Sequence, residues 1–511
     1  MSFNKTSRRE FVAAAAGAIA GSAQQLRSQT RPALNTSRIS TADRHLPRLG
    51  VHAEGHFLQT EEGHAFFWLG DTAWQLIHST TREECSYYLR TRADQGFTTI
   101  QAVVLAEFDG IRRPSALGLR PFENENPANP NEAYFNRVVE IADEAASVGL
   151  YVALLPTWAD KLTAPWGAGP RIFRNDNLGD ARNYAHYLAA KLRDRSNVIW
   201  MLGGDRPARL RGASDWLKET AVRAGFPADQ DWTPIWQALA DGLKEGSTTK
   251  PLILYHPQGG RDSTSVLLSD VKWLSVNGMQ SGHGAGHDTP VWEMIARDYA
   301  VTPPKPTLDL EPNYEDHPYN PWPEWDPATG YYRDHDVRKQ IYRSVFAGGC
   351  GVTYGHHAVW QFANLRNGVI NHADRDWTDA MQRPAARQAV FLRRLMESRP
   401  FFTRIPDQSI LASGSGNGGQ HMQATRDREG TYIFVYFPQS DLRATLDISS
   451  LHQRDRRGWW YDPRTGIGTL LEQNLGSERI EVVAPPYGPD WVLVVEDAHA
   501  QYAPPGLSSR T

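Results

Sequence analysis

The sequence predicts a (β/α)8 TIM barrel followed by a small C-terminal antiparallel β-sandwich. Between Phe66 and about Tyr354, short apolar runs alternate with helical patterns, which is the signature of βα units around a parallel sheet. This span of roughly 290 residues fits a barrel with long loops, whose usual size is about 250 residues. Farther along, alternating runs at 432–437 and 491–495, separated by Gly, Asp and Pro turns, indicate the second domain.

Eight apolar runs are the candidate strands: 66–70, 98–104, 150–155, 198–202, 252–255, 273–276, 307–310 and 351–354. Helices are predicted where apolar residues recur at spacings of three and four, at 82–95, 131–148, 181–195, 232–245, 289–299, 335–347 and 384–398. An open doubly wound sheet is the alternative fold. It is disfavoured because no Gly-x-Gly-x-x-Gly opens a helix after the first strand.

The N-terminus resembles a twin-arginine export signal. Ser-Arg-Arg-Glu-Phe-Val at 7–12 precedes a short Ala-rich run with small residues at 18–23. We therefore expect a periplasmic or secreted mature protein, and a basic tail outside the fold is the alternative. The expected domains are a signal peptide at 1–23, a linker at 24–45, the barrel at 46–400, the β-sandwich at 401–500 and a tail at 501–511.

Composition excludes several other classes of protein. The formal net charge is −4 and no long basic run occurs, which argues against nucleic acid as the main partner. No segment approaches the length of a membrane span, so we expect no stable membrane insertion of the mature protein. Cys85 and Cys350 lack any zinc-ligand spacing and are expected to be buried thiols, with one disulfide bridge as the alternative.

Two acids follow apolar runs at points where a barrel places its chemistry. Val-Ile-Trp-Met-Leu-Gly-Gly at 198–204 leads to Asp205, and Pro-Thr-Leu-Asp-Leu at 306–310 leads to Glu311. The C-terminal ends of barrel strands carry catalytic groups, and glycoside hydrolysis is the commonest reaction that needs a carboxylate pair. The structural alternative for either acid is a helix cap or an ion pair with an arginine.

Polar and aromatic residues at the other strand ends complete a candidate sugar site, because acids, amides, imidazoles and aromatic faces together suit a carbohydrate ring. The candidate substrate-binding residues are Asp71, Trp74, Glu107, Trp158, His256, Asn277, Gln280, His283, Tyr314, Trp322, Trp325, His356 and Trp360. Structural alternatives are that Asp71 holds the first turn and that Glu107 pairs with Arg112 or Arg113. The aromatic-rich loop 312–333 is the best candidate for a wall over the site.

The histidines suggest a rival chemistry, since His256, His283, His287, His356 and His357 are potential ligands of a metal. However, the first strand ends in Gly-Asp, where metal-dependent amidohydrolases have His-x-His, and His-Glu-x-x-His is absent. We therefore expect no metal site and no cofactor.

Four segments together resemble a known family: Gly-Asp-Thr-Ala-Trp at 70–74, Trp-Met-Leu-Gly-Gly-Asp at 200–205, Asn-Gly-Met-Gln-Ser-Gly-His at 277–283 and Leu-Asp-Leu-Glu-Pro-Asn-Tyr-Glu at 308–315. On these motifs, residues 46 to about 400 resemble the glycoside hydrolases of family 140, the apiosidase-type enzymes formerly labelled domain of unknown function 4038. The C-terminal part resembles the domain labelled "collagen-binding domain of a collagenase", a label that is no sign of collagen binding here.

The resemblance implies a retaining hydrolase with Asp205 as acid/base and Glu311 as nucleophile. Much of the larger barrel clan has Asn-Glu where this chain has Gly204-Asp205, and this departure agrees with the apiosidase type. The shorter Asp side chain requires a closer backbone approach, which the preceding glycines permit. We therefore expect an exported, cofactor-independent glycosidase whose substrate is an oligosaccharide or polysaccharide of plant type. The alternatives are a non-catalytic carbohydrate-binding barrel and a metal-dependent hydrolase.

Overall fold

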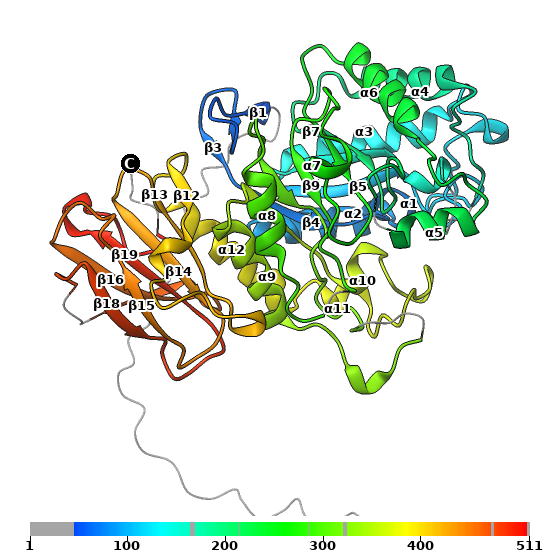
Figure 1. Ribbon diagram of the computed structural model, residues 1–511. Coiled ribbons are helices and arrows are strands. Elements are labelled where there is room, and N and C mark those ends of the chain that lie inside the picture. Colours follow the sequence, from blue (N-terminus) through cyan, green and yellow to red (C-terminus); the bar gives the residue numbers. More distant parts are fainter. Residues whose placement is uncertain are drawn as a thin grey trace, which may run out of the picture. The chain divides into compact units, whose positions relative to one another are not determined.

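The apolar runs between residues 66 and 354 form parallel strands in the computed structural model (Figure 1). It describes residues 45–163, 169–213, 215–284, 286–319, 324–471 and 475–507. The predicted signal peptide and nearly all of the predicted linker lie outside these residues. The eight parallel strands are β4 (Trp68–Thr72), β5 (Thr99–Leu105), β6 (Tyr151–Thr157), β7 (Val198–Gly203), β8 (Ile253–His256), β9 (Asn277–Met279), β10 (Thr307–Asp309) and β11 (Gly351–Tyr354).

The pairing of these strands is not continuous. Six strands form one sheet in the order β11-β4-β5-β6-β7-β8, and β9 pairs only with β10. Single backbone bonds connect the two groups, from Ser275 N to Ile253 O at 2.9 Å and from Cys350 N to Thr307 O at 3.0 Å. The described residues therefore show a curled parallel sheet and a two-stranded pair. The closed eight-stranded barrel remains a prediction.

Helices between the strands begin and end close to the predicted limits. They are α2 (Arg82–Asp94), α3 (Glu132–Ser147), α4 (Leu178–Leu192), α6 (Thr233–Gly246), α8 (Val291–Tyr299), α9 (Asp334–Phe346) and α12 (Pro384–Glu397). Thr81 and Glu84 form a capping box that starts α2, and the Asn131 side chain caps α3. Shorter helices lie in the connections: α1 (Leu76–Ser79), α5 (Asp215–Arg223), α7 (Thr264–Leu267), α10 (His357–Trp360) and α11 (Trp377–Ala380). None of the described helices is long and apolar enough to cross a bilayer.

Small antiparallel sheets flank the parallel strands. The first comprises β1 (Leu49–Val51), β2 (Leu58–Thr60) and β3 (Ala65–Phe66). The C-terminal part has a six-stranded sheet in the order β12-β13-β14-β19-β16-β17 and a separate β15-β18 pair. Its strands are β12 (Arg404–Pro406), β13 (Gln423–Asp427), β14 (Tyr432–Phe437), β15 (Arg443–Asp447), β16 (Arg456–Asp462), β17 (Ile467–Leu470), β18 (Arg479–Val483) and β19 (Trp491–Asp497). Leu446 and Val482 of the pair share one apolar cluster with Val435 and Leu493 of the sheet.

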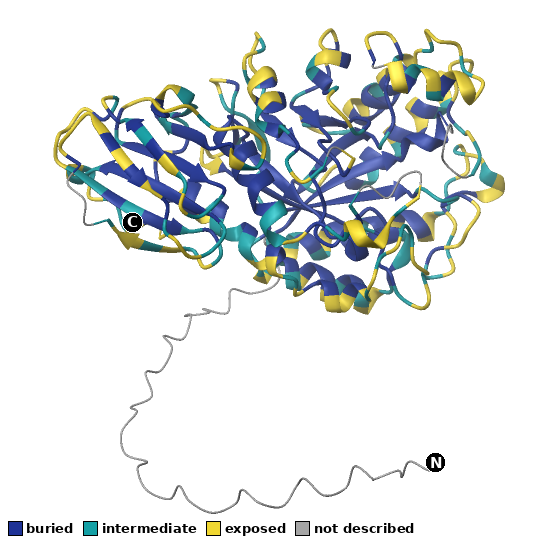
Figure 2. Cartoon of the chain, turned by 60° about the horizontal axis from the view of Figure 1, so that its bottom comes forward, coloured by how far each residue is buried: buried dark blue, intermediate teal, exposed yellow. Residues whose placement is uncertain are grey.

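The C-terminal sheet is fixed to the parallel-strand domain through α9. The Tyr342 ring stacks on Tyr436 with centroids 5.1 Å apart. Arg338, also on α9, donates to Asp490 at 2.9 Å with both side chains buried. The main apolar core includes Phe434 of the C-terminal sheet, and Figure 2 shows buried residues along the strands of both sheets. The two domains therefore share one core.

Both cysteines are buried free thiols. Cys85 lies on α2 and Cys350 lies immediately before β11. Burial raises the pKa of each thiol to about 12. Neither thiol is therefore expected to be reactive at neutral pH.

Candidate active site

Three consecutive residues, the last of β7 and the two that follow it, adopt positive φ and aim one carboxylate into the site. The φ angles are 91° at Gly203, 116° at Gly204 and 53° at Asp205. A Cβ at Gly203 would lie 2.2 Å from the carbonyl oxygen of His256, and a Cβ at Gly204 would lie 2.6 Å from the Trp158 ring. Only glycine tolerates both the conformation and the crowding, so these residues allow the backbone to approach β8 and seat Asp205 closely.

The Asp205 carboxyl group is held by an arginine and two amides. Arg206 Nη1 lies 3.0 Å from Oδ2, Gln258 Nε2 donates to Oδ1 at 3.2 Å, and the Gln280 side chain also hydrogen-bonds this carboxyl group. The side chain keeps 30% of its surface exposed, which leaves it accessible. Burial raises the pKa of Asp205, Arg206 lowers it, and the charge of Glu311 raises it again, so that the net shift is upward.

Glu311, two residues beyond β10, lies between two histidines. Its Oε1 is 3.1 Å from His283 Nε2, and its Oε2 is 3.2 Å from His256 Nε2, whose N–H is less well aligned with it. Each Nδ1 accepts a backbone N–H, from Tyr314 at 3.3 Å for His283 and from Asp205 at 3.4 Å for His256. A neutral imidazole that accepts at Nδ1 carries its proton on Nε2, so both rings present an N–H to Glu311.

Their surroundings shift the pKa values of Glu311 and Asp205 in opposite directions. Burial alone would raise the pKa of Glu311, but the contacts with His256 and His283 outweigh burial and hold it well below the usual range. Glu311 is therefore an anion at neutral pH, whereas the upward pKa shift of Asp205 favours a protonated acid. Carboxyl pairs separated in this way have distinct acid and base roles.

Aromatic rings pack around the two acids. The Trp74 indole donates to the Tyr314 hydroxyl at 3.2 Å, and that hydroxyl also interacts with Glu311. Trp74 and Trp158 both contact the His256 ring, with centroids 5.1 and 5.8 Å away. A Cβ at Gly355 would lie 2.1 Å from the Tyr314 ring, so the glycine after β11 makes room for the tyrosine.

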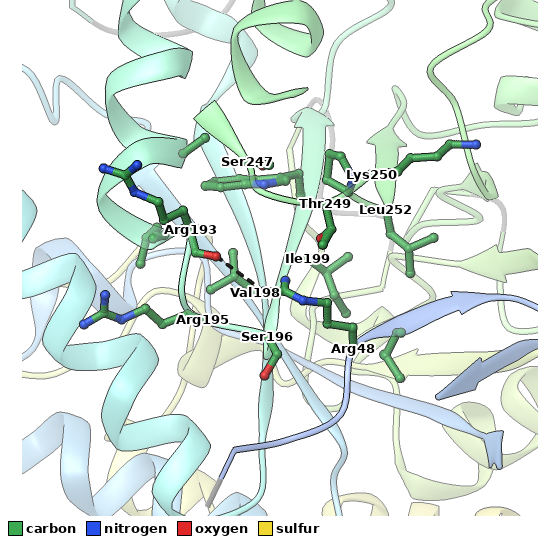
Figure 3. Close-up of a pocket in the computed structure, with 15 residues that line it drawn as sticks. Arg48, Arg193, Arg195, Ser196, Val198, Ile199, Ser247, Thr249, Lys250 and Leu252 are labelled. Atoms are coloured by element: carbon green, nitrogen blue, oxygen red, sulfur yellow. Dashed lines mark hydrogen bonds between the residues drawn. The ribbon is translucent and has the colours of Figure 1, made fainter. Parts of the chain in front are cut away.

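A separate cavity lies at the opposite ends of β7 and β8 and is lined by Arg48, Arg193, Arg195, Ser196 and Lys250, among others. Figure 3 shows the charged ends of Arg193, Arg195 and Lys250 pointing away from its centre. Arg48 donates to the backbone oxygen of Arg193 at 3.4 Å, and Arg195 pairs with Asp143. None of the carboxyl groups described above lines this cavity.

A family model for the apiosidase-like catalytic domain matches residues 52–403. The chain belongs to the apiosidase-like family. A second model, described as "Putative collagen-binding domain of a collagenase", matches residues 405–496. Comparison with curated proteins gave no match.

Solved structures similar to this apiosidase-like chain are glycoside hydrolases by title. A glycoside hydrolase family 5 protein from Bacteroides vulgatus ATCC 8482 is 29% identical, with a TM-score of 0.77 over 91% of this chain and 96% of that one. A structure titled "Glycoside hydrolase" is 28% identical, with a TM-score of 0.75 over 89% and 98% of the two chains. Together with the family match, these similarities identify a glycoside hydrolase, which acts on carbohydrate.

Of the residues predicted for the site, the structure brings together Trp74, Trp158, Asp205, His256, Gln280, His283, Glu311 and Tyr314. Glu107 joins them through Arg206, whose Nη2 lies 2.9 Å from its Oε1. The structural alternative was an ion pair of Glu107 with Arg112 or Arg113. Glu107 does form an ion pair, but with Arg206, and Arg112 pairs with Glu125.

Three residues predicted to contact substrate bind other groups of this apiosidase-like chain instead. Asp71 has no exposed surface and binds two side chains of α2, Arg92 at 2.6 Å and the Tyr88 hydroxyl at 2.5 Å. Asn277 is the first residue of β9 and donates to the backbone oxygen of Asp298 at 3.4 Å.

His356 is the third, since it is fully buried and its Nε2 lies 3.1 Å from Asp316 Oδ2. The sequence shows the position of each side chain along its strand but not its buried partner.

Of the remaining aromatic candidates, Trp360 ends α10 and Trp325 lies in the segment between β10 and α9. Trp360 Nε1 donates to His357 Nδ1 at 3.3 Å, and its ring centroid is 6.4 Å from that of Phe108. Trp325 is half-buried, with its ring 4.9 Å from His372. Trp322 lies outside the described residues. Part of the predicted aromatic wall therefore packs on loop 364–372.

Sequence reasoning missed Arg206, Gln258 and His317. Arg206 immediately follows the predicted acid, and Gln258 lies two residues beyond His256, so strand-end position was an available signal for both. His317 stacks on His283 with centroids 4.0 Å apart, a contact that no local pattern announces. Among the described residues, no three His, Cys, Asp or Glu side chains are grouped to hold a metal ion.

Proposed function

We propose that this glycoside hydrolase is a retaining enzyme in which Asp205 is the acid/base and Glu311 the nucleophile. The observation that carries the proposal is that the site favours the ionised form of one carboxyl group and the protonated form of the other. Glu311 is held as an anion between two imidazoles, whereas burial and the charge of Glu311 favour a protonated Asp205. A glycosidase with two catalytic carboxyl groups needs this division of roles, and the configuration of the product decides between retention and inversion.

The reaction proceeds in two displacements. Glu311 attacks the anomeric carbon while the Asp205 proton moves to the glycosidic oxygen, so that the bond to the leaving group breaks and a glycosyl ester forms. Water then attacks the anomeric carbon and gives its proton to Asp205, and Glu311 departs as a carboxylate. The N–H groups of His256 and His283 orient Glu311 for attack and stabilise it as it leaves.

For the substrate, we propose a plant-type complex glycan cleaved at an apiose or related sugar. Membership of the apiosidase-like family supports this class of substrate. The rings of Trp74, Trp158 and Tyr314 near the acids also suit the apolar faces of a sugar.

We also propose export through the twin-arginine route, on the basis of residues 7–23. Replacing Arg8 and Arg9 together with lysine should retain the precursor in the cytoplasm, as measured by cell fractionation. Efficient appearance of that variant in the periplasm or medium would contradict this route.

The mechanism is tested with a panel of aryl glycosides and oligosaccharides that includes apiosides. Glu311→Gln should abolish turnover of every substrate, because no glycosyl-enzyme can form. Asp205→Asn should retain more activity on substrates with an acidic phenol as leaving group, and azide should restore its rate by attacking the glycosyl-enzyme without base help.

NMR of the first product should show the anomeric configuration of the substrate. Inverted product, or equal and leaving-group-independent losses in the two variants without azide rescue, would refute the assignment. Glu315 is no substitute nucleophile as it stands, because it is fully buried and accepts from the Tyr354 hydroxyl at 2.8 Å.

A further inference from the structure

Arg206 poses a physical problem for an acid at Asp205. Its guanidinium has no exposed surface and contacts Asp205 twice, with Nη1 3.0 Å from Oδ2 and 2.7 Å from the backbone oxygen. A buried cation beside a carboxylate favours the anion, yet a general acid must carry a proton when the substrate binds. Some other group must therefore offset the charge of Arg206.

Glu107 is placed to offset that charge. It follows β5 two residues beyond the end of the strand, and its Oε1 lies 2.9 Å from the other guanidinium nitrogen, Nη2. The Glu107 side chain is only 14% exposed, so solvent screens the pair weakly. One guanidinium thus bridges two carboxyl groups from the segments after β5 and β7.

We propose that Glu107 is a positioning residue that acts on Asp205 through Arg206, by neutralising the guanidinium so that Asp205 can hold the proton it donates. This inference rests on the proposed role of Asp205. When Asp205 is protonated, the ion pair between Arg206 and Glu107 remains. When Asp205 has given up its proton, the same guanidinium stabilises both carboxylates. This lasts until the attacking water gives a proton back to Asp205.

Other charged groups around the acid do not take this role. Those facing Asp205 or Glu107 are Arg206, His256, Glu311, Asp160 and Lys161. Asp160 and Lys161 pair with each other at 2.7 Å, and Glu311 is engaged by its two histidines. The pKa of Glu107 is itself raised to about 7, chiefly by burial, with Arg206 opposing and the charges of Asp160 and Asp205 adding to the rise. The ionised form of Glu107, which offsets the charge of Arg206, therefore predominates above about pH 7.

The test measures protonation of Asp205 without a substrate. A carbodiimide with glycine methyl ester converts protonated carboxyl groups to amides, and peptide mass spectrometry follows labelling of Asp205 against pH. Glu107→Gln should move the labelling midpoint of Asp205 to lower pH by about one unit, because the full charge of Arg206 then acts on it. Glu107→Asp keeps the charge and should keep most of the wild-type midpoint.

A double-mutant cycle tests the route through the arginine. In an Arg206→Gln background, the change Glu107→Gln should move the midpoint by much less. An equal shift in both backgrounds would mean that Glu107 acts directly on Asp205, and no shift in the single variant would mean that it does not act at all. Either result overturns the inference.

Glu125→Gln is the matched control, since Glu125 pairs with Arg112 at 2.7 Å on the surface of the same loop region. In this variant the labelling midpoint of Asp205 should equal that of the wild type. With an aryl glycoside that is turned over, the alkaline limb of kcat/KM should follow the labelling result. Failure of azide rescue in Asp205→Asn would refute the mechanism itself, whereas an unchanged midpoint in Glu107→Gln would refute only the role of Glu107.

Discussion

His283 Nε2 lies 3.1 Å from Glu311 Oε1, while the Nδ1 of the same ring accepts the backbone N–H of Tyr314 at 3.3 Å. The segment that carries Glu311 therefore also fixes the tautomer of His283, which contacts Glu311. His317 stacks on this ring at 4.0 Å and keeps it in place. This closed arrangement maintains Glu311 as an oriented anion before substrate arrives, which is the preorganisation that enzymes use to lower a barrier.

The first prediction concerns this hydrogen bond. His283→Ala should lower kcat/KM roughly 10- to 150-fold, because a hydrogen bond to a charged group contributes about 1.5–3 kcal/mol. The acid limb of kcat/KM should also move to higher pH, since loss of the donor raises the pKa of Glu311 and the reaction needs its anion. His287→Ala is the control, because His287 is 40% exposed and pairs with Asp336. Equal pH profiles for wild type and His283→Ala would contradict the assignment.

The second prediction concerns the turn before the acid. Gly204→Ala should abolish most activity and lower the Tm, because its Cβ would lie 2.6 Å from the Trp158 ring at a φ of 116°. Gly225→Ala is the matched control, since Gly225 has a φ of 87° but no atom within 4 Å of an added Cβ. The control should cost only the left-handed strain, about 1–2 kcal/mol. Similar losses of activity in both variants would remove the argument from crowding.

Regular elements follow from local patterns, and the structure reproduces most of them within a few residues. The sixth strand was wrong by several residues, since the sequence predicts 273–276 and β9 is Asn277–Met279. The apolar run draws the prediction to Trp273, whereas the strand centres on Gly278, where a Cβ would lie 2.6 Å from the backbone oxygen of Tyr255. Asn277 was misplaced for the same reason.

The acids could be predicted because both follow parallel strands, but their partners could not. Asp71 and Glu107 look equivalent in sequence, as acids beyond neighbouring strands. The structure buries Asp71 against Arg92, 21 residues later on α2, and directs Glu107 to Arg206, 99 residues later. Pairs so far apart in sequence are brought together by the curl of the sheet and follow no local period. The different partners of Asp71 and Glu107 are therefore visible only in the structure.

The third prediction concerns the contact between the two domains. Asp490→Asn should destabilise the chain by roughly 3 kcal/mol, because it leaves the buried guanidinium of Arg338 without its main partner, although Asp334 still pairs with it at 2.6 Å. Urea unfolding at neutral pH measures the loss. Glu54→Gln is the control, since Glu54 lies between β1 and β2 and its bridge to Arg428, the residue after β13, is exposed, so that its loss should change stability little. Loss of only the C-terminal sheet, with an intact parallel-strand domain, would contradict the shared core.

The last prediction concerns Asp316, a buried carboxylate five residues after Glu311. Arg333, Arg375, Arg383 and His356 all approach it, at 2.5–3.3 Å. Burial would raise the pKa of Asp316, but His356 and the arginines outweigh burial and hold it well below its usual range. A carboxyl group whose pKa is lower in the folded than in the unfolded chain stabilises the fold above its unfolded pKa, about 3.9, and this stabilisation is lost as pH falls toward the folded value.

Asp316→Asn should therefore lower the free energy of unfolding by roughly 3–5 kcal/mol at neutral pH, because buried cations lose their counterion. The difference from wild type should stay constant down to about pH 5 and shrink below about pH 4, as protonation of Asp316 begins to cost the wild type the same interaction. Urea unfolding across this range measures it. Asp374→Asn is the control, since Asp374 pairs only with Arg375 among the described ion pairs and is 30% exposed. A difference that grows as pH falls would show that Asp316 is not held as an anion, and the segment carrying Glu311 would then need another anchor.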